Sequence, residues 1–367
     1  MTESDELNIL AFYLPQFHPI PENDQWWGEG FTEWTNTAKA KPLFKGHHQP
    51  NLPADLGFYD LRVPEVREAQ AKLARDYGIT GFCYWHYWFG NGKRLLERPF
   101  NEVLSSGKPD FPFCLAWANQ SWTGIWHGLK DKVLIEQKYP GKKDYTSHFN
   151  ALLPAFQDKR YIRVNNKPVF VVYSPQLIPD NQELISTWNI LAKKNGIEGF
   201  YFIGIHKDKD WDHKRIGYDD KTIHQPSHYV QIYERKLKNH LNGIIQRNLL
   251  KGLRPLVYDY RKLARHYDFS FSNPNDLIPT IVPNWDNSPR SGKRGWVFHK
   301  STPESFGEHF EESVQFILKR DISLPKMIFI KSWNEWAEGN YLEPDQRYGL
   351  RYLEEISKAL SKYNFTK

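Results

Sequence analysis

The chain has 367 residues, and 16% of them are aromatic: 14 Trp, 20 Tyr and 23 Phe. This aromatic and apolar content excludes a disordered chain, because enough surface can be buried to offset chain entropy. No run of about 18 apolar residues is free of charges, which excludes a membrane-spanning helix. The formal net charge of +6 is mild for this length. A solvated lysine-rich surface accounts for it, and attraction to anionic ligands is the alternative.

Two features bear on the cellular compartment. The two cysteines, Cys83 and Cys114, lie in apolar strand-like runs, so we expect buried free thiols and no disulfide framework. The acidic segment 1–7 lacks the basic start and apolar core of a signal peptide. We therefore expect a cytoplasmic protein.

Strand-like and helix-like segments alternate along nearly the whole chain. The expected strands are, in order, 8–14, 79–85, 111–118, 168–173, 199–203, 277–283 and 327–330. The expected helices are 64–77, 94–105, 144–157, 180–196, 302–319 and 346–363, several of them bounded by Pro or Gly or opened by a capping pattern. The polar stretch 207–276 is only partly periodic and is expected to be an irregular, elaborated section.

This alternation predicts parallel strands joined by helical crossovers. Seven or eight such units in a chain of this length, without a linker or repeat, favour a (β/α)₈ barrel that forms a single domain over residues 1–367. A doubly wound open sheet is the alternative.

In a barrel of this kind the active site is built from the loops after the strands. Aromatic rings beside amide or carboxylate groups follow almost every expected strand. Each ring alone could simply pack in the core, but together they predict a binding cleft for sugars, which offer apolar faces and hydroxyl edges. No basic groove pairs with these aromatics as in single-strand nucleic-acid binders, so nucleic acid is not expected. The predicted substrate-binding residues are Tyr13, Gln16, His18, Trp27, Glu33, Trp34, Tyr84, Trp85, His86, Trp88, Trp117, Asn119, Trp122, Tyr173, His206, Trp285, Asp286, Arg290, Asn334 and Trp336.

The strongest catalytic candidates are Glu335 and Glu338, after the last strand. They point to opposite sides in an extended segment but come together in a helical turn, which the following Gly339 would permit. Close carboxyls in an aromatic pocket have pKa values that move apart, so one stays ionised while the other donates a proton. Paired acids of this kind hydrolyse glycosides, and a short separation favours retention of configuration. Two surface glutamates at a helix start are the alternative, which the adjacent tryptophans disfavour.

Other catalytic motifs are absent from the sequence: there is no nucleophile elbow, no zinc motif and no phosphate loop of the required spacing. Asp208 and Asp210 have the Asp-x-Asp spacing with which many sugar-nucleotide transferases hold a metal, but such short matches are common by chance and a solvated charge run is the favoured interpretation. We therefore expect no metal and no cofactor.

Five motifs together resemble the WbsX family, which is found in bacterial O-antigen and capsule gene clusters and is similar to glycoside hydrolase family 99. They lie at residues 11–18 (AFYLPQFH), 27–34 (WGEGFTEW), 81–85 (GFCYW), 284–290 (NWDNSPR) and 333–338 (WNEWAE). The resemblance covers nearly the whole chain and is weakest at 207–276.

The resemblance implies a (β/α)₈ barrel and a retaining, endo-acting enzyme for a mannose- or rhamnose-type glycan. By analogy with family 99, Glu335 would deprotonate the 2-hydroxyl of the sugar, which attacks the anomeric carbon to form a 1,2-anhydro sugar. Glu338 would protonate the departing oxygen and then activate the acceptor. Reasoning from the residues alone leaves a direct carboxylate nucleophile equally open.

Two other functions remain open from the sequence. WbsX proteins are usually labelled glycosyltransferases, so the chain could form glycosidic bonds in O-antigen or capsule biosynthesis with the same acids or with a nucleotide donor held by Asp208 and Asp210. It could also be a non-catalytic glycan-binding barrel. The expected partner in every case is an oligosaccharide or polysaccharide, and the sequence does not predict the oligomeric state.

Overall fold

A parallel eight-stranded barrel organises the chain, as seen in a computed structural model that describes residues 7–124, 133–235, 241, 243–244, 252–267, 269 and 272–365. Its strands, in the order in which they neighbour one another, are β10 (Asp220–Ile223), β9 (Tyr201–His206), β8 (Lys167–Val172), β4 (Phe113–Trp117), β2 (Gly81–Trp88), β1 (Leu7–Tyr13), β14 (Lys326–Ile330) and β12 (Thr280–Ile281). The barrel predicted from the sequence is confirmed.

The two ends of this strand order meet, so the sheet curves around on itself. A parallel bridge joins Thr222 of β10 to Ile278, two residues before β12, and the hydroxyls of Thr222 and Thr280 lie 2.6 Å apart. The strand β10 lies inside the stretch expected to be irregular, and part of that stretch is outside the described residues. No strand is predicted there from the sequence, because DKTI is short and two of its four residues are charged.

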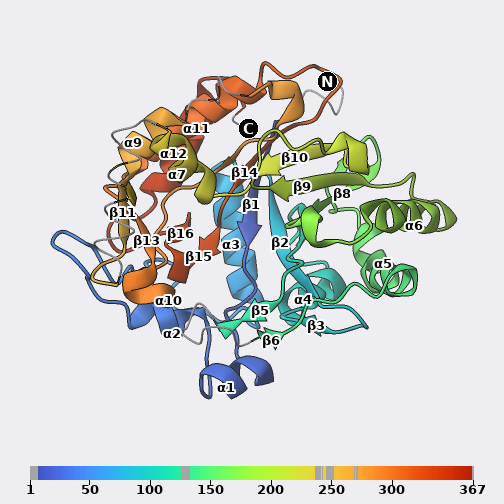
Figure 1. The fold of residues 1–367 in the computed structure, drawn as a ribbon, viewed down its shortest axis with the longest axis horizontal. Helices are drawn as coiled ribbons and strands as arrows, with labels where there is room; N and C mark the ends of the chain where they lie inside the picture. The colour runs from blue at the N-terminus through green and yellow to red at the C-terminus, as the bar shows by residue number, and fades with distance from the viewer. Residues whose placement is uncertain are drawn as a thin grey trace.

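Helices surround the barrel and short strands elaborate its loops. The helices are α1 (Pro21–Trp27), α2 (Glu33–Ala38), α3 (Pro64–Asp76), α4 (Arg98–Ser106), α5 (Lys142–Phe156), α6 (Asn181–Lys194), α7 (Ser227–Glu234), α9 (Tyr260–His266), α10 (Ser288–Ser291), α11 (Pro303–Ile317) and α12 (Arg351–Ser361). The short strands are β3 (Arg94–Leu95), β5 (Trp122–Thr123), β6 (Val133–Ile135), β7 (Arg163–Val164), β11 (Leu256–Asp259), β13 (Trp296–His299), β15 (Asn334–Glu335) and β16 (Asn340–Tyr341). Figure 1 shows α1, α2, α10, β5, β6 and β15 gathered towards the same end of the barrel.

Local sequence signals explain where these helices begin. Pro64 opens α3, and α11 has a reciprocal capping box between Thr302 and Ser305. At α6, the Asp180 carboxylate accepts a 2.9 Å hydrogen bond from the main-chain nitrogen of Glu183. The proline and capping residues recognised in the sequence therefore set where these crossover helices begin.

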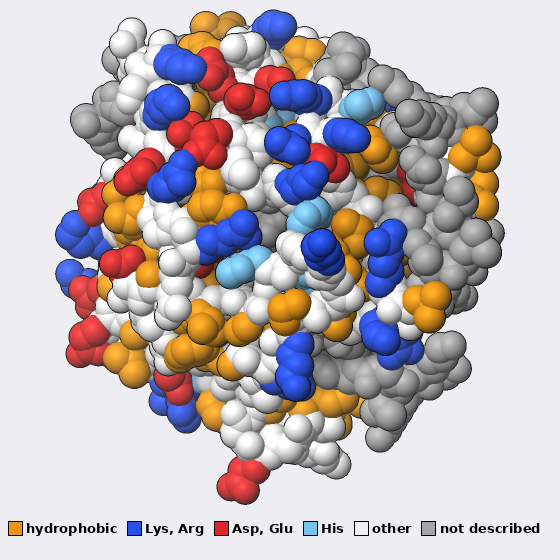
Figure 2. Space-filling model, turned by 90° about the vertical axis from the view of Figure 1, so that its left-hand side faces the viewer, with side chains coloured by type: hydrophobic (Ala, Val, Ile, Leu, Met, Phe, Trp, Pro, Cys, Tyr) orange, Lys and Arg blue, Asp and Glu red, His pale blue; other side chains and the backbone are white. Residues whose placement is uncertain are grey.

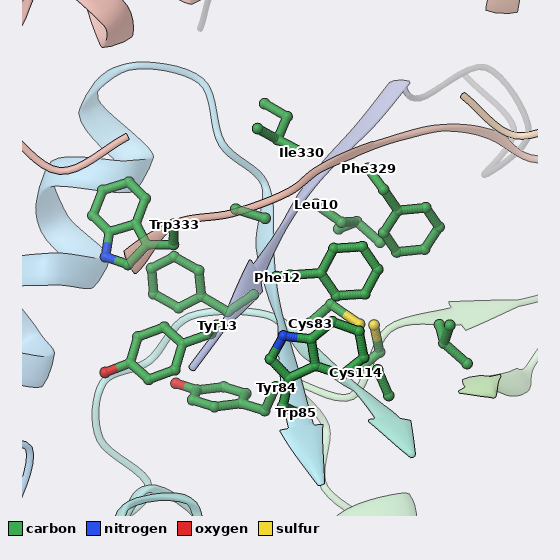
Figure 3. Packing of buried hydrophobic residues seen from close by; sticks show 14 of the residues in the cluster. Leu10, Phe12, Tyr13, Cys83, Tyr84, Trp85, Cys114, Phe329, Ile330 and Trp333 are labelled. Carbon is green, nitrogen blue, oxygen red and sulfur yellow. The ribbon is translucent and has the colours of Figure 1, made fainter. Parts of the chain in front are cut away.

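Alternation along the strands divides the aromatic residues between the barrel interior and the helix layer. Phe12 and Trp85 face inwards and stack with ring centroids 4.6 Å apart. Cys83 and Cys114 are register partners on β2 and β4, and both are buried free thiols, as expected. Figure 3 shows these inward residues packed at the centre, with the two sulfur atoms side by side.

The surface carries charges of both signs. Figure 2 shows one face, on which Lys, Arg and His side chains gather near the centre and acidic groups lie mainly in the upper and left parts of the view. No described helix is long and apolar enough to cross a membrane.

Candidate active site

The segment after β14 turns sharply and brings Glu335 and Glu338 together at the barrel mouth. Glu335 ends β15, residues 336–338 form a 3-10 turn, and Gly339 follows with φ 62°. A Cβ at Gly339 would lie 2.7 Å from the main-chain nitrogen of Asp286, and that nitrogen donates a 2.7 Å hydrogen bond to the main-chain oxygen of Glu338. Glycine is therefore needed for this turn to pack against the loop that follows β12.

A cavity of about 510 Å³ opens above the two glutamates. Its size is that of a small-molecule site, and apolar rings make up much of its wall. The residues that line it are Leu14, Gln16, Asn23, Trp27, Phe31, Glu33, Asn36, Trp85, Tyr87, Ala118, Gln120, Ser121, Trp122, Thr123, Leu134, Tyr173, His224, Gln225, Pro226, Ser227, Trp285, Asn287, Arg290, Ser291, Arg294, Trp296, Lys331, Glu335 and Glu338.

The two carboxyls have different hydrogen-bond partners. Glu335 receives Lys331 Nζ at 3.3 Å on Oε1 and 3.1 Å on Oε2, and Trp85 Nε1 donates to its Oε1 at 2.8 Å. Glu338 receives Arg290 Nη1 on Oε1 at 2.7 Å, whereas its Oε2 lies 3.9 Å from Lys331 Nζ. A side-chain hydrogen bond also joins the two glutamates.

These partners separate the pKa values of the pair. Burial favours the protonated form of Glu335 most strongly, yet the charge of Lys331, the hydrogen bond with Glu338 and the charge of Arg290 together lower its pKa to about 2. Burial raises the pKa of Glu338 to about 7, with the charge of Glu335 adding to the effect and Arg290 opposing it. Between about pH 2 and 7, one carboxyl is therefore favoured as the carboxylate while its neighbour holds a proton, the division that acid–base catalysis requires.

Arg290 links this pair to a third acid. Its Nη2 lies 2.6 Å from Glu33 Oε1, and the same oxygen accepts a 3.2 Å hydrogen bond from the main-chain nitrogen of Ala337. Glu33 is 1% exposed, so the cost of burying its charge is offset by the guanidinium. Residues 335–338, the turn that carries the two glutamates, thus contact both α2 and α10.

The opposite wall presents hydroxyl and imidazole groups. Tyr173 lies edge-on to Trp85 with ring centroids 5.5 Å apart, and its hydroxyl is 2.5 Å from His224 Nε2. His224 Nδ1 in turn lies 3.0 Å from the Ser227 hydroxyl. Burial lowers the pKa of His224 to about 3, so this imidazole is neutral at physiological pH and acts as a hydrogen-bonding group.

The cavity brings together ten of the residues predicted from the sequence. Besides the two glutamates, these are Gln16, Trp27, Glu33, Trp85, Trp122, Tyr173, Trp285 and Arg290. They come from loops or strand ends on β1, β2, β4, β8, β12 and β14, which are far apart in sequence.

Five predicted residues on the strands face the helix layer instead of the cavity, and a sixth, in the loop after β1, does not line the cavity either. Tyr84, His86 and Trp88 alternate with the inward Trp85 and Tyr87, and contact Phe100, His148 and Asp144 on α4 and α5. Tyr13 donates a hydrogen bond to Gln70 of α3. Trp117 donates a hydrogen bond to the main-chain oxygen of Trp88 and packs on His148. His18 is buried outside the lining of the cavity.

The remaining predicted residues support the loops and do not line the cavity. Asn334 bonds the main chain of Leu14 through both its amide atoms, and Asn119 does the same for Ser174. Trp34 and Trp336 pack on each other. Asp286 accepts hydrogen bonds from His47 and Gln49. His206 stacks on Trp211. Their part is to hold the loops that carry the lining residues.

Several lining residues were not predicted from the sequence. Tyr87 could have been found by strand alternation from Trp85, because both point inwards. Gln120 and Asn287 lie in the same strand-end segments as predicted residues, whereas Lys331 and His224 carried no comparable signal in the sequence. A lysine that follows a strand usually reaches solvent, and His224 follows a strand, β10, that the sequence does not indicate.

The Asp-x-Asp segment lies away from the cavity. Asp208 Oδ1 accepts a hydrogen bond from the main-chain nitrogen of Asp210, whose own carboxylate pairs with Lys209. Neither aspartate lines the cavity. Among the described residues, no group of three or more His, Cys, Asp or Glu side chains could hold a metal ion.

The barrel places the chain among proteins with a glycoside-hydrolase-like fold. It superposes on the family 99 endo-α-mannosidase of Bacteroides thetaiotaomicron with a TM-score of 0.56 and 14% identity, covering 98% of each chain. The family model described as "Glycosyltransferase WbsX" matches residues 9–356, and the chain therefore belongs to the WbsX family.

Two curated relatives extend this comparison. The chain is 37% identical to the uncharacterized protein WxcX of Xanthomonas campestris pv. campestris over 99% of its own length and 51% of that protein. It is also similar to a glycoprotein endo-α-1,2-mannosidase of Xenopus laevis, at 22% identity over 83% of this chain and 62% of the relative. The chain thus spans about half the length of the WxcX protein that it matches.

Proposed function

We propose that this chain is an enzyme that acts on glycosidic bonds with retention of configuration, with Glu335 and Glu338 as its catalytic pair. The observation that carries the proposal is that two buried carboxyls with unlike hydrogen-bond partners, Lys331 and Trp85 for Glu335 and Arg290 for Glu338, lie at the floor of an aromatic-walled cavity. Close contact between the carboxyls supports retention, because an inverting pair stands about 6.5–9.5 Å apart to admit a water molecule.

The two environments suggest a role for each acid. Glu335, ionised, removes the proton of the sugar 2-hydroxyl, and O2 attacks C1 as the bond from C1 to the leaving oxygen breaks. Glu338 gives its proton to that oxygen. In the second half of the reaction, Glu338 deprotonates the hydroxyl of the incoming acceptor, and its oxygen attacks C1. The C1–O2 bond breaks, and O2 recovers its proton from Glu335.

A direct attack of Glu335 on C1 is the competing route, and the 2-hydroxyl distinguishes the two. An analogue whose reactive sugar lacks this hydroxyl cannot form the 1,2-anhydro intermediate. Turnover of the 2-deoxy analogue with trapping of a Glu335 ester would establish the direct route, whereas no turnover of an analogue that still binds supports assistance by the hydroxyl.

A mannose- or rhamnose-type glycan is the proposed substrate. The names of the frog relative and of the Bacteroides structure both refer to α-mannosides. The wall also carries polar side chains beside its rings, among them Gln16, Gln120 and His224, which suit the hydroxyl groups of a sugar.

Turnover of defined α-mannosyl and α-rhamnosyl oligosaccharides by the purified chain tests the proposal. Glu335→Gln and Glu338→Gln should each lower kcat by about 10²–10⁴-fold with the fold retained, since each removes one acid–base group. Glu354→Gln, at an exposed position on α12, is the matched control. Oligosaccharide binding without turnover, unchanged in the double Gln variant, would instead establish a non-catalytic binding barrel.

Bond formation is the second candidate, and the family description favours it. The same pair makes a glycosidic bond when a sugar hydroxyl takes the place of water in the second half. Product analysis with a sugar acceptor present separates the two activities: an elongated glycan indicates transfer, and a free reducing sugar indicates hydrolysis.

A further inference from the structure

Lys331 is a buried cation directly beneath the two glutamates. It follows β14, and its side chain, 11% exposed, lines the cavity. Its Nζ lies 5.5 Å from the Trp85 ring centroid and 5.6 Å from that of Trp285. A buried ammonium group is costly unless paired, and in the described part of the chain its carboxylate partners are Glu335 and Glu338.

The contacts of Lys331 with the pair are unequal. Its Nζ is within 3.3 Å of both oxygens of Glu335 but 3.9 Å from the nearer oxygen of Glu338. With the Trp85 indole, Glu335 therefore receives donors on both of its oxygens. Among the described residues, the nitrogen donors near Oε2 of Glu338 are the ammonium at 3.9 Å and Asn340 Nδ2 at 3.5 Å, so that oxygen can hold the proton of the pair.

The other cation of the site does not act on the pair in the same way. Arg290 binds Glu338, but it also binds the buried carboxylate of Glu33. Its charge is therefore shared with an acid outside the pair, whereas that of Lys331 falls on the pair itself. The other titratable groups facing the pair are Tyr87, Tyr173 and His224, whose burial favours their neutral forms.

We propose that Lys331 is the positioning residue that assigns the two catalytic roles: its ammonium holds Glu335 as the carboxylate, so that the single proton of the pair resides on Glu338. The expected effect of Lys331 on turnover rests on the proposed function, whereas its effect on the protonation of the two glutamates does not. The direction of the shifts agrees with this role, because the charge of Lys331 is the largest influence that lowers the pKa of Glu335. Conversely, the two glutamates raise the pKa of Lys331 against the effect of burial.

The protonation of the pair can be measured without a substrate. Carboxyl ¹³C chemical shifts of protein labelled with [5-¹³C]glutamate are followed from pH 3 to 9, and Glu335→Gln and Glu338→Gln assign the two signals. Wild-type Glu335, with a pKa of about 2, should stay ionised over this range, whereas in Lys331→Met its signal should titrate within the range, at least a tenfold change in its ionisation equilibrium. Lys331→Arg, which keeps the charge, should restore the low value.

Lys221→Met is the matched control. Lys221 is also a buried lysine of the barrel, near the start of β10, but its Nζ bonds the main-chain oxygen of Trp211 and it does not line the cavity. Its loss should leave both signals in place. An unchanged Glu335 titration in Lys331→Met would overturn the inference, as would a shift of equal size in Lys221→Met. If Lys331→Met does not fold, the same comparison is made with Lys331→Gln, which keeps a hydrogen-bond donor without the charge.

The pH profile of kcat/KM provides a second test, because loss of a merely structural ion pair would not shift it. On an accepted glycan, Lys331→Met should shift the acid limb of kcat/KM upwards in pH, and Lys331→Arg should return it. Failure of the proposed function is recognised separately, as unchanged turnover in Glu335→Gln and Glu338→Gln. The carboxyl titration decides the role of Lys331 in either case.

Discussion

Nη1 of Arg290 lies 2.7 Å from Oε1 of Glu338, and Nη2 of the same guanidinium binds Glu33 at 2.6 Å. One side chain from the loop after β12 thus fixes an acid that follows β14 and another at the start of α2. This arrangement leaves Glu338 buried and hydrogen-bonded on one oxygen while its other oxygen can hold a proton. The expected chemistry of the site depends on that proton.

The pH dependence of turnover should have its alkaline limb near pH 7. Burial raises the pKa of Glu338 to about 7, so its proton is present below that pH and is lost as the pH rises through it. Glu335, with a pKa of about 2, stays ionised across the assay range. We expect kcat/KM to be level from about pH 4 to 6 and to fall about tenfold per unit well above 7. A profile that stays level to pH 9 would contradict the acid role of Glu338.

Trp122 should contribute to glycan binding without supporting the fold. It lines the cavity, is half-buried, and has an edge-on contact with Tyr87 at 5.2 Å. Trp122→Ala is expected to weaken oligosaccharide binding about tenfold, or about 1.4 kcal/mol, because it removes an apolar face from the wall. Calorimetry in a Glu335→Gln background measures this without turnover. Phe58→Ala removes an aromatic side chain that is 55% exposed outside the cavity, and it should leave the affinity unchanged.

Glu343 should matter for stability, since it holds residues 335–338, the turn that carries the two catalytic glutamates. Its carboxylate accepts hydrogen bonds from Trp336 Nε1 at 2.7 Å, Tyr59 Oη at 2.8 Å and Gln70 Nε2 at 2.7 Å. Glu343→Leu leaves three buried donors unpaired, each worth about 1–3 kcal/mol. Urea unfolding should show a loss of at least about 3 kcal/mol, against about 0.5 kcal/mol or less for the exposed control Glu354→Leu. Equal stability of the two variants would mean that this network is dispensable.

A metal-dependent nucleotide donor should not use the Asp-x-Asp segment. Asp208 is engaged with the main chain of Asp210, and Asp210 pairs with Lys209. We expect calorimetry with nucleoside-diphosphate sugars and Mn²⁺ to give the same result for the wild type and for the Asp208→Asn, Asp210→Asn double variant. Binding that requires Mn²⁺ and is lost in the double variant would restore the nucleotide form of the transferase hypothesis.

The barrel could be predicted from the sequence because its longer strands are continuous apolar runs between recognisable helices. Within those runs the functional side chains were harder to assign. Residues 84–88 are all aromatic or histidine, so composition alone does not separate the inward Trp85 and Tyr87 from the outward Tyr84, His86 and Trp88. Strict use of the two-residue period would have made that separation.

Other parts of the site had no signal in the sequence. The strand β10 spans four residues, two of them charged, so the position of His224 at a strand end was hidden. The pairing of Arg290 with Glu33 joins residues 257 positions apart, and the contact of Lys331 with Glu335 depends on how the chain turns after β14. The first of these contacts arises only when the barrel closes, and the second only when the segment after β14 turns.

The most direct test of the catalytic pair is the anomeric configuration of the first-formed product, followed by ¹H NMR while an α-mannosyl or α-rhamnosyl oligosaccharide is turned over. The pair in close contact predicts that the product first appears as the α-anomer and mutarotates later, and that Glu335→Gln and Glu338→Gln form it at least a hundredfold more slowly. A first-formed β-anomer, or formation at the wild-type rate in both variants, would contradict the assignment of Glu335 and Glu338 as a retaining pair.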